Sequence, residues 1–550
     1  MTVSRRGWLA LSVAGLALAA SLTSLGNGFA YDDNLAILIN PRVHTLASPW
    51  GAFAQSYWPV DRGGGLYRPV TVLLFAGQWA VGQGSPLLFH LVNVLLYAGL
   101  SALVFWCALA LLPAGAAWLV AALFAVHPVH VEAVGNVVGQ AELTTALAVV
   151  LAVGLYLRWR QAAPAAPLSG GRVAGLGLLY LVACTTKEHG IVLPGLLLAA
   201  EATVLAEGGG GWRARLRQLR PLYLLLTLLA LAFLALRTRV LGSFAGDLSA
   251  QTFQSLGAWP RLLTMLALVP QWVRLLYWPA HLQADYSSQE TRVVHTPDLA
   301  VAIGALVLLA TIVLAIRSRR NRPVVAFGIL WVLVALFPTS NLVIPTGIVL
   351  AERTMFLPSV GAMLVAGDLA VRAWAGLKEG TPFVRSLAAI ALGTLICAAA
   401  IRSAARQPVW ADDEVLKAQM VIDAPRSYWA HWLYGDYLYH TDRLAEGERH
   451  MRLAIELEPD NAYIQMLLGQ RYQDHGFCQP AVQYLSRAVE LTPERWRTRL
   501  RLIRCQLDLG RFDDARAQIR TGLDVGLSPS DFKAALRSVD SAAAVAGSHR

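Results

Sequence analysis

Long apolar runs alternate with short polar stretches along roughly the first 400 residues of the chain. An apolar run of about 20 residues crosses the hydrocarbon core of a bilayer as a helix. Runs of this kind, some slightly shorter, lie near residues 8–26, 87–111, 114–127, 138–157, 173–186, 190–206, 221–236, 299–316, 324–338, 357–375 and 386–401. The pattern predicts an all-α, polytopic membrane helical bundle with about eleven spans.

Arginines indicate how these spans are oriented. Arg5 and Arg6 precede the first run, which favours a cytoplasmic N-terminus and an uncleaved first span. A cleavable export signal is the alternative, but it fits less well with so many further apolar runs. With the N-terminus inside, residues 27–85 form a first external loop and residues 238–297 contain a second.

Residues 258–280 are apolar and aromatic, so they could either cross the membrane or lie at its surface. If they crossed the membrane, the arginine-rich stretch at 317–322 would lie outside, against the positive-inside rule. We therefore predict an interfacial or re-entrant helix pair there.

After Trp410 the chain becomes polar and helical, with a period of 34 residues. Pro425, Pro459 and Pro493 share this spacing, as do Gly435 and Gly469. Small residues and a closing proline at this period are typical of tetratricopeptide repeats. We predict a membrane domain at 1–405, repeats at 406–524 (two clear and a third degraded) and a capping helix and tail at 525–550.

Composition supports this class. The chain of 550 residues is 56% hydrophobic and only 15% charged, and its mean hydropathy is +0.49. The net charge of +11 comes from clusters between apolar runs, so no nucleic-acid partner is expected. The five cysteines form no CxxC motif, so neither a zinc site nor a disulfide framework is indicated, although Cys478 and Cys505 could pair if the repeats are exported.

The first candidate site is Tyr31-Asp32-Asp33-Asn34, just beyond the first apolar run. Carboxylates at the membrane boundary stay ionised and can face a lipid-borne substrate. Asp33 or Asp32 could act as general base on an acceptor hydroxyl while the other orients it or holds a cation. The alternative is that the pair only caps a helix end or sets topology.

Further polar residues lie at the external ends of other spans. His127, His130 and Glu132 could line a polar cavity or, less readily, hold a metal, because HxxH with an internal proline does not fix the ring spacing. Lys187 and Glu188 could form a simple ion pair or meet a phosphate. The remaining candidates are Arg68, Glu142, Arg239, Glu352 and Arg353. The three arginines could bind the anionic headgroup of a substrate, or they could simply anchor the protein to phospholipids.

Together these blocks resemble the transmembrane and tetratricopeptide repeat-containing protein O-mannosyltransferases. The resemblance rests on their order in the chain, namely Tyr31-Asp32-Asp33, Tyr67-Arg68-Pro69, His127-Pro128-Val129-His130-Val131-Glu132, Lys187-Glu188-His189-Gly190 and Ala351-Glu352-Arg353-Thr354. It implies a GT-C glycosyltransferase fold that moves a sugar from a polyprenyl-phosphate donor. The chain departs from the animal members in having few repeats.

The resemblance also implies roles for residues and partners. Asp33 or Asp32 would serve the acceptor, and the other polar blocks would surround the donor phosphate and sugar. No cofactor is required in principle, although a divalent cation is not excluded. The expected partners are the lipid-linked donor, membrane lipids and an acceptor polypeptide in the repeat groove. A composition rich in Ala, Leu, Gly and Arg suggests a bacterial inner membrane, with the site and the repeats on the periplasmic face.

Alternative functions stay open from sequence alone. The acceptor could be a lipid or a glycan instead of a protein. A non-catalytic membrane scaffold and a lipid-linked-sugar transporter also fit buried charges and broken helices.

Overall fold

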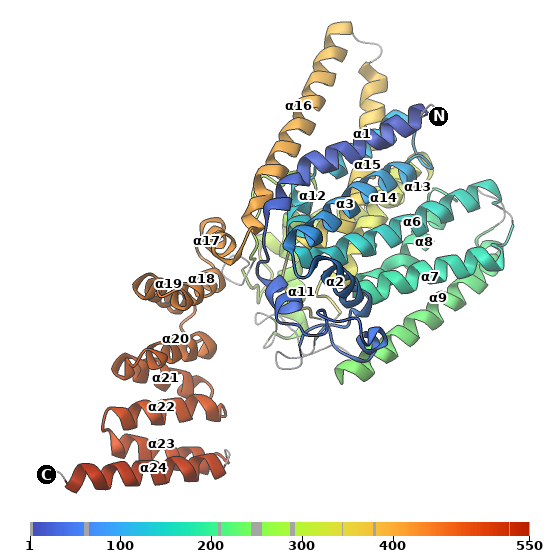
Figure 1. Cartoon of the computed structure of the whole chain (residues 1–550). Helices are drawn as coiled ribbons and strands as arrows, with labels where there is room; N and C mark the ends of the chain where they lie inside the picture. The colour runs from blue at the N-terminus through green and yellow to red at the C-terminus, as the bar shows by residue number, and fades with distance from the viewer. Residues whose placement is uncertain are drawn as a thin grey trace. The chain divides into compact units, whose positions relative to one another are not determined.

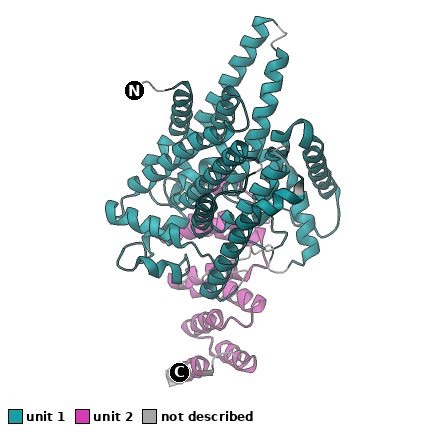
Figure 2. Ribbon diagram, turned by 90° about the vertical axis from the view of Figure 1, so that its right-hand side faces the viewer, with its two compact units in different colours: residues 1–419 teal, residues 420–550 magenta. Residues whose placement is uncertain are grey.

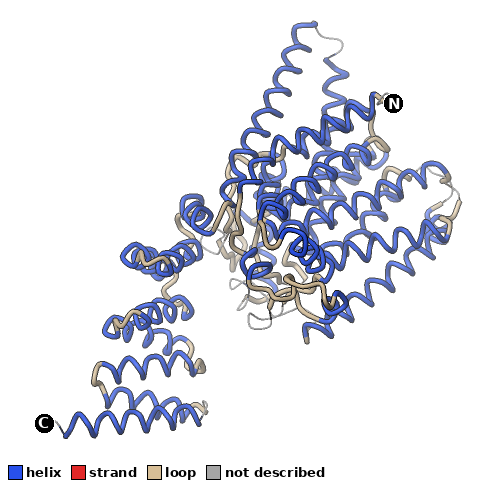
Figure 3. The backbone as a smooth tube through the Cα atoms, viewed as in Figure 1, coloured by secondary structure: helices blue, strands red, loops and turns tan. Residues whose placement is uncertain are grey.

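The computed structural model describes residues 4–59, 65–164, 166–206, 211–243, 253, 256–286, 292–343, 345–377, 381–526 and 529–548. The predicted second external loop, 238–297, lies partly outside these residues. The chain divides into two compact units, Met1–Gln419 and Met420–Arg550 (Figure 2). The described residues form helices and loops without strands (Figure 3), which confirms the all-α class.

The first unit is a bundle of helices of very different lengths (Figure 1). Its α-helices are α1 Arg5–Ser21, α2 Pro69–Gly82, α3 Pro86–Ala108, α4 Ala114–Ala125, α5 Val131–Gly135, α6 Gln140–Ala162, α7 Gly170–Thr186, α8 Leu193–Ala202, α9 Trp212–Leu241, α11 Ala258–Ala267, α12 Val269–Tyr277, α13 Leu299–Asn321, α14 Pro323–Leu336, α15 Phe356–Leu377 and α16 Pro382–Arg406.

Each predicted span corresponds to a helix, but not every helix is long. Among the described residues, seven helices are long and apolar enough to cross a membrane, or eight if α4 and its bent continuation count as one. The estimate of about eleven is higher because it includes the shorter helices α7, α8 and α14. Several long apolar helices identify an integral membrane protein.

Residues 258–280 form the two short helices α11 and α12, of 10 and 9 residues. At 1.5 Å per residue neither reaches across a bilayer. The helix pair is as predicted, whereas its position at the membrane interface stays a prediction.

Small residues allow close packing in the core of this unit. At the contact of α14 with α15, a Cβ added to Gly328 would lie 2.6 Å from the carbonyl oxygen of Gly361. Larger side chains would push the two helices apart, which is why small residues are common where membrane helices touch. The α1 helix packs against α3, α4 and α16.

A buried ion cluster lies at the C-terminal end of α8. Glu201 accepts hydrogen bonds from Arg160 Nε at 2.8 Å and from the Tyr156 hydroxyl at 2.9 Å. The Arg215 guanidinium is 3.5 Å from the same carboxylate. The side chains of Arg160, Glu201 and Arg215 are at most 4% exposed, so the cluster is cut off from water.

The second unit confirms the tetratricopeptide prediction. Its helices are α18 Tyr428–His440, α19 Leu444–Leu457, α20 Ala462–Asp474, α21 Cys478–Leu491, α22 Trp496–Asp508, α23 Phe512–Asp524 and α24 Pro529–Ser548, and they follow α17 Asp413–Asp423. The first helices of the three pairs begin 34 residues apart, and so do the second helices. The third pair keeps this spacing although Ile503 occupies the position of Gly435 and Gly469.

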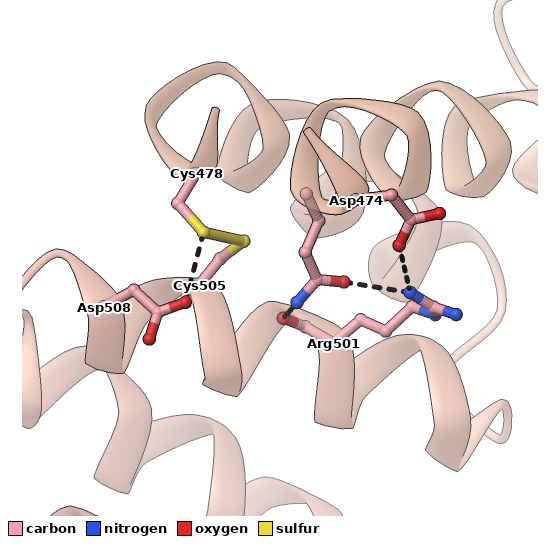
Figure 4. Close-up of a disulfide and its surroundings, with 6 residues drawn as sticks. Asp474, Cys478, Arg501, Cys505 and Asp508 are labelled. Atoms are coloured by element: carbon pink, nitrogen blue, oxygen red, sulfur yellow. Dashed lines mark hydrogen bonds and ion pairs between the residues drawn. A yellow bond between two sulfur atoms is a disulfide. The ribbon is translucent and has the colours of Figure 1, made fainter. Parts of the chain in front are cut away.

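A disulfide joins neighbouring helix pairs in this unit. Cys478 at the start of α21 is bonded to Cys505 of α22, with a Cα–Cα distance of 5.0 Å (Figure 4). An ion pair between Arg501 and Asp474, 3.4 Å apart, lies beside it. The conditional pairing predicted from the sequence is therefore present.

Replacing both bonded cysteines, Cys478→Ala with Cys505→Ala, is expected to lower the free energy of unfolding of the repeats by about 2–4 kcal/mol. The bond closes a loop of 27 residues and so restricts the unfolded chain. Urea unfolding of the full-length protein, followed by a probe in the repeats, measures this loss. Cys397→Ala, which removes an exposed free cysteine, is the control. Equal midpoints for the double variant and the control would contradict the prediction.

Candidate functional site

Asp32 and Asp33 lie in a tight turn beyond α1. Tyr31 has a φ of 54°, a left-handed conformation that a bulky residue rarely adopts. The turn is held by two long-range hydrogen bonds, from Tyr31 N to Asp413 Oδ1 and from Gly28 N to Ala411 O, both 2.7 Å. Strained backbone of this kind persists where its surroundings hold it in place, and it is common at functional sites.

Asp33 points into the protein and binds backbone. Its carboxylate accepts hydrogen bonds from the N–H groups of Val138 at 2.8 Å, Val137 at 3.2 Å and Ala30 at 3.4 Å. Burial raises the pKa of Asp33 to about 8, and these N–H groups oppose that rise. Both oxygens are occupied, so Asp33 ties the turn to the beginning of α6. This is the capping role that the sequence left as an alternative.

Asp32 has a different environment. Its side chain is partly exposed, and its carboxylate makes no hydrogen bond or ion pair to the residues that the structure describes. Burial raises the pKa of Asp32, and the nearby charge of Arg353 lowers it. The charges of Glu132, Arg68 and Glu142 also act on Asp32. Asp32 is thus the carboxylate of the pair that remains available to a substrate.

Three ion pairs surround Asp32. Arg68 Nε donates to Glu188 Oε2 at 3.0 Å, and the Lys187 ammonium contacts Glu142. Arg353 contacts Glu132 twice, through its guanidinium and, at 2.7 Å, through its backbone N–H. The six partners come from segments far apart in the sequence, so the fold gathers the predicted Arg68, Lys187–Glu188, Glu142, Glu132 and Arg353 into one charged cluster.

Tyr57 belongs to this cluster and was not predicted. The Arg68 guanidinium lies 5.4 Å from the centre of the Tyr57 ring, within the range of a cation–π contact. The buried Tyr57 hydroxyl has no hydrogen-bond partner among the described residues. The charges of Asp32 and Glu142 act on it. Only its position in the predicted first external loop could have suggested it, since a lone tyrosine carries no motif.

The two histidines are internal. His127 Nε2 is hydrogen-bonded to the Leu276 carbonyl at 3.0 Å, and His130 lies between the Tyr97 hydroxyl and Ser359 Oγ, at 2.9 and 2.8 Å. Both side chains are buried and hydrogen-bonded within the protein, and the cavity wall favoured from the sequence stays a prediction. No group of three or more metal-binding side chains occurs in the described part of the chain.

Glu352 and Arg239 lie outside the three ion pairs. Glu352 accepts hydrogen bonds from the Gln283 N–H and, at 3.0 Å, from the Tyr286 hydroxyl, so it holds the segment that follows α12. Its neighbour Arg353 is the residue that faces Asp32. Arg239 is exposed in the last turn of α9. The structure therefore does not bring it to the charged cluster.

The cluster can support a polar group transfer. A partly exposed carboxylate beside partly buried cations can accept a proton from a hydroxyl. Fixed positive charges nearby can stabilise a developing negative charge on a leaving group.

Comparisons with known proteins show what the chain is similar to. The tetratricopeptide repeat family matches residues 479–538. Protein O-mannosyl-transferase TMTC3 of Homo sapiens is 26% identical over 515 residues, which cover 88% of this chain and 55% of the human protein. Protein O-mannosyl-transferase Tmtc2 of Drosophila melanogaster is 36% identical over 52% of this chain and 31% of its own length. The chain spans just over half the length of the first of these relatives.

One solved structure is more distantly similar. The crystal structure of the Archaeoglobus fulgidus oligosaccharyltransferase, tethered with an acceptor peptide, matches 73% of this chain and 55% of its own with a TM-score of 0.43 and 15% identity. The likeness to the curated relatives confirms the resemblance predicted from the order of the polar blocks.

Proposed function

Since the chain is similar to protein O-mannosyl-transferases over most of its length, we propose that it is a GT-C type membrane glycosyltransferase. It transfers a sugar, with mannose as the first candidate, from a polyprenyl phosphate to a Ser or Thr hydroxyl of exported proteins. The observation that carries the proposal is the partly exposed Asp32 carboxylate beside three ion pairs.

The proposed reaction is a single inverting displacement. The acceptor oxygen bonds to the anomeric carbon as the bond from that carbon to the phosphate oxygen breaks. The hydroxyl proton passes to Asp32, and the electron pair of the broken bond leaves with the polyprenyl phosphate. Arg353 and Lys187, each already paired with a carboxylate, supply positive charge on the side of the leaving group.

The repeats are proposed to bind the acceptor polypeptide. Stacked helix pairs present an extended concave surface that suits a peptide. The disulfide between Cys478 and Cys505 supports an oxidising compartment for this unit, because such bonds persist outside the cytoplasm. We propose the extracytoplasmic face of a bacterial inner membrane for both the repeats and Asp32.

Glycoproteomics of exported proteins tests the proposed function. A strain lacking this chain should lose a set of O-linked hexoses on Ser or Thr, and the wild-type gene should restore them. If no such peptide differs between the strains, protein glycosylation is wrong. If Asp32→Asn restores the same peptides as wild type, Asp32 is not the base and the proposed reaction is wrong.

A further inference from the structure

The helix α9 has two contrasting faces along most of its length. The side chains that pack into the protein are at most 4% exposed and recur at helical spacing, and they are Arg215, Leu219, Leu222, Leu226 and Phe233. On the opposite face, exposed side chains recur every three or four positions, and they are Arg213, Arg217, Arg220, Leu224, Leu228 and Leu231. At 3.6 residues per turn this second set forms one continuous line, which we call the α9 stripe.

The leucines of the α9 stripe face out of their unit. Leu224, Leu228 and Leu231 are 52%, 63% and 58% exposed, and only 22% of the most apolar part of α9 is buried within the protein. Figure 1 shows α9 at the edge of the bundle, where it packs against α7. The outward face of a helix in water is polar, so these leucines indicate contact with the hydrocarbon of a bilayer.

The arginines of the α9 stripe lack acidic partners. All three are exposed, and no carboxylate among the described residues forms an ion pair with them. They are four and three positions apart, a spacing at which like charges on a helix repel each other. The first turn of α9 contains no acidic residue, although the positive end of the helix dipole lies there. An anion at this end of α9 would relieve both unfavourable interactions.

Arg215 fixes the direction in which the stripe faces. Its guanidinium lies 3.5 Å from the Glu201 carboxylate and donates to the backbone carbonyl groups of Glu201, at 3.0 Å, and Leu205, at 3.0 and 3.1 Å. These contacts hold the beginning of α9 against the end of α8. Because Arg215 is on the buried face, the three stripe arginines are held on the side that faces away from the protein.

The length of the α9 stripe matches one leaflet of a bilayer. From Arg220 to Leu231 it extends about 16 Å, at 1.5 Å per residue. Half of the hydrocarbon core is about 15 Å thick. With the arginines at the level of the headgroups, the leucines therefore reach to about the middle of the bilayer. Guanidinium groups bind phosphate by forked hydrogen bonds, so a phospholipid with an anionic head matches the stripe in both length and charge.

We propose that the α9 stripe binds an anionic phospholipid of the surrounding membrane. The phosphate of the lipid lies at Arg213, Arg217 and Arg220, and an acyl chain lies along Leu224, Leu228 and Leu231. Clusters of basic side chains at the ends of membrane helices recognise anionic lipid heads in this way. The inference does not rest on the proposed function, because none of these residues belongs to the charged cluster around Asp32.

Native mass spectrometry of the purified full-length protein in detergent, titrated with phosphatidylglycerol, tests the proposal. The triple variant Arg213→Gln, Arg217→Gln and Arg220→Gln should bind the first lipid at least 10-fold more weakly than wild type. If the triple variant does not fold, Arg217→Gln alone, at an exposed side chain, should still weaken binding several-fold. The matched control is Arg239→Gln, which removes an exposed arginine in the last turn of the same helix and should bind like wild type.

Two further probes separate an anionic lipid from other occupants. Phosphatidylcholine, whose head has no net charge, should bind at least 10-fold more weakly than phosphatidylglycerol. Glycerol phosphate, which has the anionic head without the tails, should displace phosphatidylglycerol poorly. Equal binding of the two lipids would mean that the stripe contacts only acyl chains, and efficient displacement by glycerol phosphate would mean that it binds a free phosphate. Either result would overturn the proposal, as would equal affinities of Arg217→Gln and Arg239→Gln.

Discussion

Asp32→Asn is expected to reduce the rate of sugar transfer by about 10²–10⁴-fold, the usual contribution of a general base. The amide keeps the shape of the side chain but cannot accept the proton. Because the carboxylate makes no hydrogen bond or ion pair to the described residues, little stability should be lost. Transfer from a polyprenyl-phosphate sugar to a synthetic peptide, with donor binding measured in parallel, provides the readout.

The pH dependence of wild type gives a second test of the same role. Burial raises the pKa of Asp32 above its ordinary value of 3.8. A base works only when ionised, so the rate should fall as the pH drops through this raised pKa, at a pH above 3.8. A rate that stays constant down to pH 4 would contradict the assignment.

Asp33→Asn is the matched comparison, and it should act through stability. Backbone N–H groups donate to both Asp33 oxygens. In asparagine one of these oxygens becomes an NH2 group, which is itself a donor and cannot accept the hydrogen bond. Leaving a buried group unsatisfied costs about 1–3 kcal/mol. The variant should accumulate less and melt earlier, while the folded fraction keeps more activity than Asp32→Asn. The opposite ranking of the two rates would make Asp33 the base.

The sequence could predict the charged cluster but not its internal geometry. Arg68, Glu132, Glu142, Lys187, Glu188 and Arg353 were candidates because ionisable residues beside hydrocarbon are expensive. Which aspartate faces them depends on a left-handed Tyr31 and on hydrogen bonds between Asp33 and residues more than 100 positions away. Local sequence contains neither feature.

The repeats were easier to predict because their geometry is local. Each helix pair contacts mainly its neighbours, so a fixed period in the sequence becomes a fixed spacing of helices. Arg402 and Arg406 show the opposite case. Both arginines follow an apolar run and resemble ordinary flanking charges in the sequence, and only the structure shows that they donate to the carbonyl groups of Ala280 and Leu282.

Glu201→Ala is expected to lower the free energy of unfolding of the membrane unit by about 3–5 kcal/mol. The substitution leaves the Arg160 and Arg215 guanidinium groups buried without their carboxylate. Removing one partner of a buried ion pair has an effect of this size, because the remaining charge is neither hydrated nor compensated. Unfolding in mixed micelles measures the change.

The control for Glu201→Ala is Asp368→Ala, whose partner Arg372 is 47% exposed and stays hydrated when the pair is broken. Asp368→Ala should lower the free energy of unfolding by less than Glu201→Ala does, because the arginine left behind is hydrated. Lys187 and Glu188 precede α8, whereas Glu201 lies in its last turn, so the folded fraction of Glu201→Ala should retain its rate of transfer. A large loss of rate without a loss of stability would mean that the two ends of α8 are coupled. Equal unfolding energies for both variants would show that water or rearrangement compensates the two arginines.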